Sequence, residues 1–122
     1  MVKNVVILGS TGSIGVQTLN IIRRNPDKFN VVGLTANTDT ELLYKQAKEF
    51  SPELVGITDT AAAKNAEKAF EKLSIKTVVG KDALTAAAKL KSADTVVVAV
   101  VGMCGLESVL AAAECGKNIA LA

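Results

Sequence analysis

The sequence predicts the α/β fold class, with one parallel sheet covered by helices on both faces. Short apolar runs rich in β-branched residues alternate along the chain with longer amphipathic or alanine-rich segments. That alternation is typical of strands joined by crossover helices. The chain has 122 residues, of which 49% are hydrophobic, so it is long enough for one domain with a core of its own.

Six strands are expected, at residues 5–8, 31–35, 54–58, 77–80, 95–101 and 118–121. The fifth run is almost wholly apolar, so both of its faces must be covered, and we place it beside the first strand. The fourth run lies between Lys76 and Lys81, which is typical of an edge strand. These placements predict a Rossmann-like, doubly wound sheet in the order 4-3-2-1-5-6. Its switch point lies between strands 1 and 5, where such sheets bind ligands.

Five helices are expected between these strands, at residues 13–25, 40–50, 60–72, 82–90 and 106–115. The first has apolar residues at helical spacing and ends before Pro26. Asp39 or Thr40 caps the second helix, and Asp59 or Thr60 caps the third, because such side chains accept hydrogen bonds from first-turn N–H groups. The third and fourth are rich in alanine, which is the strongest helix former, and Gly116 is placed as a left-handed C-cap after the fifth.

Charge and composition exclude several classes of function. The 14 basic and 12 acidic residues are spread along the chain, and there is no basic block or aromatic cluster of the kind that binds nucleic acid. The chain has no His, which excludes His bases, Ser–His or Cys–His pairs and His-ligated metals within it. No group of Cys, Asp and Glu has metal-ligand spacing. We therefore assign no catalytic and no metal-binding residue.

The sequence also predicts a cytoplasmic location. Its start has no secretory signal, and no apolar run approaches the ~18 residues of a membrane span. Cys104 and Cys115 do not form a C-x-x-C motif, and they favour a reduced protein over one with a disulfide between them.

A glycine loop follows the first strand. Gly9, Gly12 and Gly15 have the spacing G-x-x-G-x-x-G, a relative of the dinucleotide-binding fingerprint, between a strand and a helix. Gly9 permits the sharp turn, Gly12 lets a pyrophosphate approach the backbone, and Gly15 lets the helix pack closely on the first strand. Hydroxyl donors are added by Ser10, Thr11 and Ser13. The pattern favours phosphate or dinucleotide binding over a tight turn without a ligand, and a Walker A loop is excluded.

The residues after the second strand bear on the choice of cofactor. An NAD-binding domain has an acidic residue near the end of this strand, and none stands at Thr35 or Ala36. Asn37 and Thr38 offer neutral donors for a 2′-phosphate, although no Lys or Arg accompanies them. Asp39 is better placed as a helix cap than as a cofactor contact. These residues leave NAD and NADP both open and favour NADP narrowly.

A second candidate region follows the fifth strand. Val101, Gly102 and Met103 are expected beside the nicotinamide half of the cofactor, on a loop that Gly102 and Gly105 keep low. Met103 and Cys104 are then expected to pack against the ring. The alternative is that Met103 and Cys104 only fill the core. Glu107 is expected in the first turn of the next helix, where its charge favours the helix dipole.

Several stretches resemble the N-terminal part of the 1-deoxy-D-xylulose 5-phosphate reductoisomerase family: "GSTGSIG", "NPDKF", "EFSPELVGITD" and "AVVGMCGLESVLAAAECGKNIALA". They occur in the family's order and cover essentially the whole chain. The resemblance implies an enzyme of non-mevalonate isoprenoid synthesis, which rearranges 1-deoxy-D-xylulose 5-phosphate and reduces it with NADPH to 2-C-methyl-D-erythritol 4-phosphate. It also implies a longer, homodimeric protein assisted by a divalent cation, Mg²⁺ or Mn²⁺.

The resemblance also assigns site residues. Along the pyrophosphate and nicotinamide side of NADPH it places Thr11, Gly12, Ser13 and Ile14. Asn37, Thr38 and Asp39 lie where the family holds the 2′-phosphate, although members often have Gly-Lys-Asn there. The family's metal ligands and substrate-binding residues follow later in its longer chain, so this chain alone is expected to be inactive and to bind no metal.

The domain organisation expected from these observations is a single dinucleotide-binding domain over residues 1–122. The last strand stops at Ala122 with no cap or polar tail, which indicates an N-terminal fragment that lacks the catalytic and C-terminal domains. The alternative is a free-standing nucleotide-binding regulatory module without catalysis. A third hypothesis is that the glycine loop binds coenzyme A.

Overall fold

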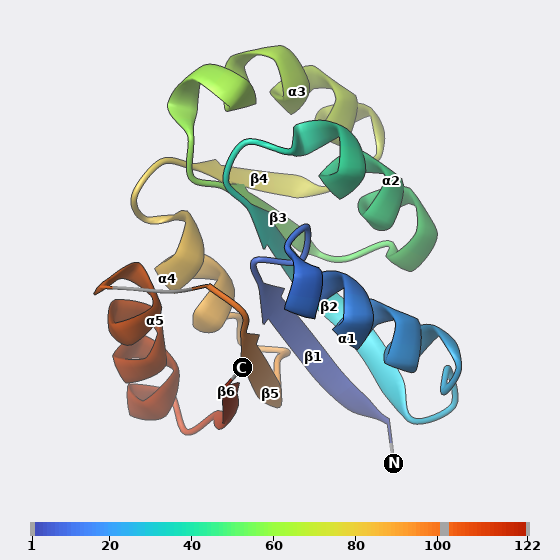
Figure 1. Cartoon of the computed structure of the whole chain (residues 1–122), viewed down its shortest axis with the longest axis vertical. Coiled ribbons are helices and arrows are strands. Elements are labelled where there is room, and N and C mark those ends of the chain that lie inside the picture. The colour runs from blue at the N-terminus through green and yellow to red at the C-terminus, as the bar shows by residue number, and fades with distance from the viewer. Residues whose placement is uncertain (1, 101–102, 122) are drawn as a thin grey trace.

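Six parallel strands form one sheet in the order β4-β3-β2-β1-β5-β6, as the sequence predicts. The structure is a computed structural model that describes residues 2–100 and 103–121. The strands are β1 Lys3–Leu8, β2 Phe29–Ala36, β3 Leu54–Ile57, β4 Lys76–Val79, β5 Thr95–Val98 and β6 Asn118–Leu121. Helices α1, α2 and α3 lie on one side of the sheet and α4 and α5 on the other (Figure 1). The fold is therefore the predicted Rossmann-like, doubly wound sheet.

The helices are α1 Ser13–Arg23, α2 Thr40–Phe50, α3 Thr60–Lys72, α4 Ala83–Ala88 and α5 Met103–Glu114. Asp39 caps α2 by accepting a hydrogen bond from the Leu42 N–H at 3.1 Å, and Asp59 caps α3 in the same way through Ala61 and Ala62. These caps confirm one of the two candidates predicted at each helix start. Within the described residues, no helix is long and apolar enough to cross a membrane.

The end of β5 differs from the prediction. The strand ends at Val98 instead of residue 101, and α5 begins at Met103 instead of residue 106. Val98 pairs with Leu8, the last residue of β1, and the chain turns away from the sheet at Gly9. The apolar run continues past this point, but the neighbouring strand does not, so the ladder stops with the bond from the Ala99 N–H to the Leu8 carbonyl.

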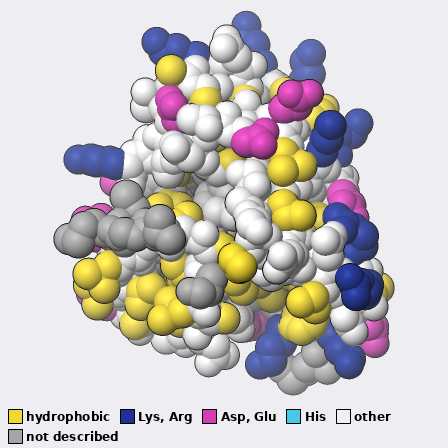
Figure 2. Space-filling model, in the orientation of Figure 1, with side chains coloured by type: hydrophobic (Ala, Val, Ile, Leu, Met, Phe, Trp, Pro, Cys, Tyr) yellow, Lys and Arg dark blue, Asp and Glu magenta, His cyan; other side chains and the backbone are white. Residues whose placement is uncertain are grey.

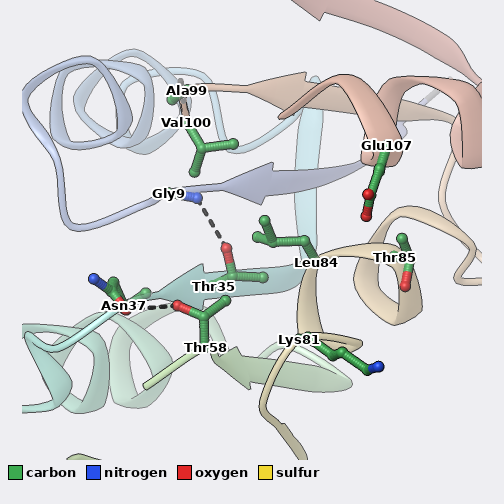
Figure 3. Close-up of a pocket in the computed structure, with 11 residues that line it drawn as sticks. Gly9, Thr35, Asn37, Thr58, Lys81, Leu84, Thr85, Ala99, Val100 and Glu107 are labelled. Carbon is green, nitrogen blue, oxygen red and sulfur yellow. Dashed lines mark hydrogen bonds between the residues drawn. The ribbon is translucent and has the colours of Figure 1, made fainter. Parts of the chain in front are cut away.

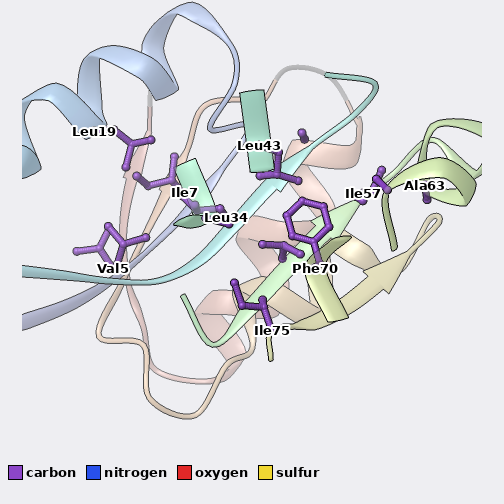
Figure 4. Packing of buried hydrophobic residues seen from close by; sticks show 14 of the residues in the cluster. Val5, Ile7, Leu19, Leu34, Leu43, Ile57, Ala63, Phe70 and Ile75 are labelled. Carbon is purple, nitrogen blue, oxygen red and sulfur yellow. The ribbon is translucent and has the colours of Figure 1, made fainter. Parts of the chain in front are cut away.

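Two apolar layers hold the helices to the sheet. Val5 and Ile7 of β1 belong to the layer under α1, α2 and α3, and Val6 and Leu8 belong to the layer under α4 and α5. Successive residues of a strand point to opposite faces, so one buried strand supplies both layers. Phe70 of α3 is fully buried in the first layer, where Figure 4 shows it near Leu43 of α2. Strand pairing within this core brings the carboxyl ends of β1, β2, β3 and β5 together along one edge of the sheet.

Candidate dinucleotide-binding site

A cavity of about 790 Å³ lies at the carboxyl ends of the strands. Its lining consists of Gly9, Thr35, Ala36, Asn37, Thr58, Lys81, Leu84, Thr85, Ala99, Val100 and Glu107 (Figure 3). Residues just after each of the strands β1 to β5 line this cavity, and side chains of α4 and α5 complete its walls. Because β1 and β5 are neighbours in the sheet, the cavity includes the predicted switch point. Its size is within the range of small-molecule sites.

The three glycines of the loop have different structural roles. Gly9 has φ +84°, a conformation that side chains rarely adopt, and a Cβ there would lie 2.8 Å from Val100 Cγ1. A Cβ on Gly15 would lie 2.2 Å from the Gly9 carbonyl oxygen. By contrast, a Cβ on Gly12 would meet only that same oxygen, at 3.6 Å. Gly15 therefore packs on the loop backbone, whereas the prediction placed it on the first strand. Gly12 has room for a side chain, with one carbonyl oxygen in ordinary contact.

A buried hydrogen-bond network ties the loop to β2 and α2. The Gly9 N–H donates to Thr35 Oγ1 at 2.9 Å, and the Ser10 N–H donates to the Thr35 carbonyl at 2.8 Å. Ser10 Oγ donates to Gln46 Oε1 at 2.7 Å, and Gln46 Nε2 donates to the Ser10 carbonyl at 2.9 Å. All three polar residues, Ser10, Thr35 and Gln46, are buried. The network holds the backbone of the loop in one conformation.

The side chain of Ser10 corrects one sequence-based prediction. Its hydroxyl was expected to donate to a phosphate, but it is fully buried and engaged with Gln46 and, at 3.2 Å, with the Thr35 carbonyl. The tight turn at Gly9 directs the next side chain into the protein, toward α2. Thr35 and Gln46 support the loop, a role that no sequence-based prediction assigned to them. Their signal is a polar side chain at an inward position of an otherwise apolar strand or helix face.

The N-terminus of α1 faces outward from the loop. Gly12 is its N-cap with extended backbone, φ −78° and ψ 174°, and makes no side-chain cap. Thr11 is half-buried, whereas Ser13 and Ile14 are exposed, and no acidic residue stands in the first turn. Since the first N–H groups of a helix have no partner within it, this end offers donors and a partial positive charge. Such an arrangement suits a phosphate group.

The segment after β2 forms the rim of the cavity. Asn37, Thr38 and Asp39 are exposed. Asp39 caps α2 as predicted, so its carboxylate already accepts a hydrogen bond. Thr58 Oγ1 donates to Asn37 Oδ1 at 2.8 Å (Figure 3). The Asn37 amide nitrogen has no hydrogen-bond partner in the part of the chain that the structure describes, so it is a donor available at the rim.

The predicted nicotinamide region is only partly visible. Val101 and Gly102 lie outside the described residues, and so does the side chain of Met103, the first residue of α5. Because α5 begins at Met103, Glu107 is not in the first turn, which corrects that expectation. Glu107 is exposed and lines the cavity instead.

The charged and thiol groups that the structure describes form no metal-ligand arrangement. Over residues 2–100 and 103–121, no three His, Cys, Asp or Glu side chains come together as metal ligands. Cys115 is a free, exposed thiol. Basic and acidic side chains are interspersed around the visible face of the molecule in Figure 2.

Fold and site together define a Rossmann-type α/β domain with a glycine loop of the phosphate-binding kind at its switch point. Comparison with known sequences gives the family. The profile of 1-deoxy-D-xylulose 5-phosphate reductoisomerase matches residues 5–122, and the chain belongs to this family.

Curated relatives bear the same description over a longer chain. The 1-deoxy-D-xylulose 5-phosphate reductoisomerase of Geotalea uraniireducens (strain Rf4) is 46% identical over 120 residues, which are 98% of this chain and 31% of the relative. That of Porphyromonas gingivalis (strain W83) is 47% identical over 122 residues, which are 100% of this chain and 32% of the relative. The chain therefore spans about a third of the length of the curated relatives it matches.

Solved structures agree in fold as well as sequence. The reductoisomerase from Zymomonas mobilis in complex with NADPH has a TM-score of 0.91 and 38% identity, and covers 100% of this chain with 32% of its own. A second reductoisomerase, in complex with NADPH, fosmidomycin and magnesium, has a TM-score of 0.89 and 37% identity. This second match covers 97% of this chain and 29% of the other.

Proposed function

We propose that residues 1–122 are the NADPH-binding domain of a 1-deoxy-D-xylulose 5-phosphate reductoisomerase. The observation that carries the proposal is the glycine loop, anchored by buried hydrogen bonds beside a cavity of about 790 Å³ at the switch point. Support comes from the Zymomonas mobilis relative, which is solved in complex with NADPH and matches all of this chain with about a third of its own. The whole protein would rearrange and reduce 1-deoxy-D-xylulose 5-phosphate to 2-C-methyl-D-erythritol 4-phosphate.

The loop and the start of α1 are the proposed pyrophosphate site. Gly12 leaves space for the phosphates, since its Cβ position meets a single atom within 4 Å. The N–H groups of Ser13 and Ile14 then donate to phosphate oxygens, with the hydroxyl groups of Thr11 and Ser13 beside them. Gly9, Ser10 and Gly15 act by shaping the loop. Their backbone contacts keep the donors in place before the cofactor arrives.

The adenosine half of NADPH is proposed to occupy the cavity. Leu84, Ala99 and Val100 provide an apolar wall for the adenine ring. Ala36 and Asn37 at the end of β2 lie where the adjoining ribose would be. The nicotinamide half would extend across the switch point toward α5. NADPH supplies a hydride there, and this chain binds and orients the molecule that carries it.

The remaining parts of the reaction are assigned to the longer protein. The chain has no His, and its described residues hold no cluster of metal ligands. We therefore place the site for Mg²⁺ or Mn²⁺, the sugar-phosphate site and the proton-transferring groups outside residues 1–122. A homodimer in the cytoplasm is part of the same proposal. The isolated chain would bind cofactor without turnover.

Calorimetric titration of the purified chain with NADPH tests this function. We expect saturable binding that Gly12→Val abolishes, because the added side chain occupies the space left for the phosphates. The matched control is Ala113→Val, which places the same side chain at an exposed position near the end of α5, outside the cavity lining. Absence of NADPH binding, or a Gly12→Val chain that binds normally, would contradict the proposal. Both a regulatory module and a fragment would bind NADPH, so a turnover assay with 1-deoxy-D-xylulose 5-phosphate on the product of the whole coding sequence separates these two: turnover supports the reductoisomerase, and its absence supports the module.

A further inference from the structure

The rim of the cavity offers few groups for the phosphate that distinguishes NADPH from NADH. This phosphate carries close to two negative charges at neutral pH and is normally met by a cation near the end of the second strand. No Lys or Arg stands between Thr35 and Thr40 in this chain. Asp39, in the same segment, is negative and caps α2. A cation for the phosphate can only come from another element of the fold.

Lys81 lies on that rim although it is far from β2 in sequence. The register pairs Ala36 with Ile57 and Ile57 with Val79, so the carboxyl ends of β2, β3 and β4 are level. The residues just beyond these ends include Asn37, Thr58 and Lys81, and all three line the same cavity (Figure 3). Neighbouring strands are about 4.8 Å apart, so β4 is roughly 10 Å from β2. Figure 3 shows the Lys81 side chain extended away from Asn37. Because this side chain is exposed, rotation about its single bonds can turn it toward β2, and its length bridges most of that distance to a phosphate held between them.

The charge of Lys81 is available for a ligand. Its side chain is exposed and has no ion-pair or hydrogen-bond partner among the described residues. The other charged residue that lines the cavity is Glu107, and Figure 3 shows it across the cavity from Asn37, beside Thr85. The neighbour Asp82 is also exposed and makes no cap hydrogen bond in α4. Lys81 is therefore the cationic group of the described cavity lining.

We infer that Lys81 binds the 2′-phosphate of NADPH and sets the preference of this chain for NADPH over NADH. The inference rests on the proposed function, and it adds to that site a cation from the connection between β4 and α4. Lys81 acts as a mobile point charge, while the Asn37 amide donates a neutral hydrogen bond from the opposite side. The phosphate lies between them, over the end of β3.

The test compares ligands with and without the 2′-phosphate on charge-matched variants. NADPH and 2′,5′-ADP carry this group, whereas NADH and 5′-AMP lack it. Lys81→Gln removes the proposed contact. Lys76→Gln makes the same change in charge at the opposite end of β4, outside the cavity lining. We expect Lys81→Gln to weaken the binding of NADPH and 2′,5′-ADP about tenfold, which is the effect of one charge-assisted hydrogen bond. The affinities for NADH and 5′-AMP should stay unchanged.

Two further readouts separate a local contact from a general effect of charge. Lys81→Arg should retain the preference for NADPH over NADH. In the unmodified chain, 0.5 M salt should reduce the difference in affinity between 2′,5′-ADP and 5′-AMP, whereas in Lys81→Gln salt should not change that difference. The inference is wrong if Lys81→Gln binds NADPH normally, or if Lys81→Gln and Lys76→Gln weaken all four ligands alike. In both cases NADPH binding itself survives, so the proposed function stands. If the unmodified chain binds none of the four ligands, the proposed function fails and this inference fails with it.

Discussion

Replacement of Gln46 by leucine tests the anchoring of the glycine loop. Leucine is close to glutamine in size, so the change mainly removes the two hydrogen bonds with Ser10, of 2.7 and 2.9 Å. The Ser10 hydroxyl keeps its 3.2 Å contact with the Thr35 carbonyl as acceptor. The Ser10 carbonyl, however, loses the amide of Gln46 as its donor, and Ser10 has no exposed surface on which water could replace it. A buried, unsatisfied acceptor costs about 1–3 kcal/mol. We therefore expect Gln46→Leu to lower the free energy of unfolding by about 2 kcal/mol.

Urea unfolding followed by circular dichroism measures this loss, with the midpoint lowered and the slope unchanged. A loss of about 2 kcal/mol corresponds to a melting temperature lower by roughly 6–12 °C for a domain of this size. Gln17→Leu, at an exposed position of α1, is the matched control and should change little. A double-mutant cycle with Ser10→Ala should show a coupling energy of at least about 0.5 kcal/mol. A Gln46→Leu chain as stable as the control, or purely additive effects, would refute the anchoring role.

Three further predictions follow from the loop and its surroundings. Gly15→Ala should lower the melting temperature sharply, because its Cβ would lie 2.2 Å from the Gly9 carbonyl oxygen. Gly12→Ala should melt like the unmodified chain. Equal melting temperatures of the two variants would contradict the assigned roles. Asp39→Ala should cost about 1 kcal/mol of stability in urea unfolding, because Asp39 caps α2. It should not weaken NADPH binding, because it removes a negative charge near the proposed phosphate site; a selective loss of NADPH affinity would disprove the capping role. The hydrogen bond from Arg23 lowers the pKa of Glu49 below its ordinary value of 4.5, so this exposed pair stabilises the fold above that pH. The pair contributes at most about 1 kcal/mol to the free energy of unfolding, and this is lost as the pH falls through the lowered pKa of Glu49. Glu49→Gln should therefore remove this decrease in stability from urea unfolding measured at acidic pH.

Much of the architecture could be predicted from local features of the sequence. The fifth apolar run must be covered on both faces, which places that strand inside the sheet. Lys76 and Lys81 flank the fourth run, which places that strand at an edge, and the two placements predict the strand order. Asp39 was expected to cap α2 because a short polar side chain before an amphipathic segment has that role wherever it occurs. The turn at Gly9 was expected for the same kind of reason, and its φ of +84° confirms it. Each of these features depends on a few neighbouring residues.

The boundary between β5 and α5 could not be predicted in this way. The apolar pattern of residues 95–101 continues without a break, and nothing in it indicates an end at Val98. The strand ends there because β1 turns away at Gly9, some ninety positions earlier in the chain. The altered start of α5 then moves Glu107 out of the first turn and onto the wall of the cavity.

The sequence by itself determined the fold class, the order of the strands, the position of the glycine loop and the family. The tertiary structure decided which side chains support that loop and which face the cavity. Ser10 points inward to Gln46, which is 36 residues away, and Lys81 comes level with Asn37 through two strand pairings. Local periodicity and capping chemistry act over a single turn or strand. The partners of a buried polar group depend on how distant elements pack, and that is settled only when the whole sheet and its helices are in place.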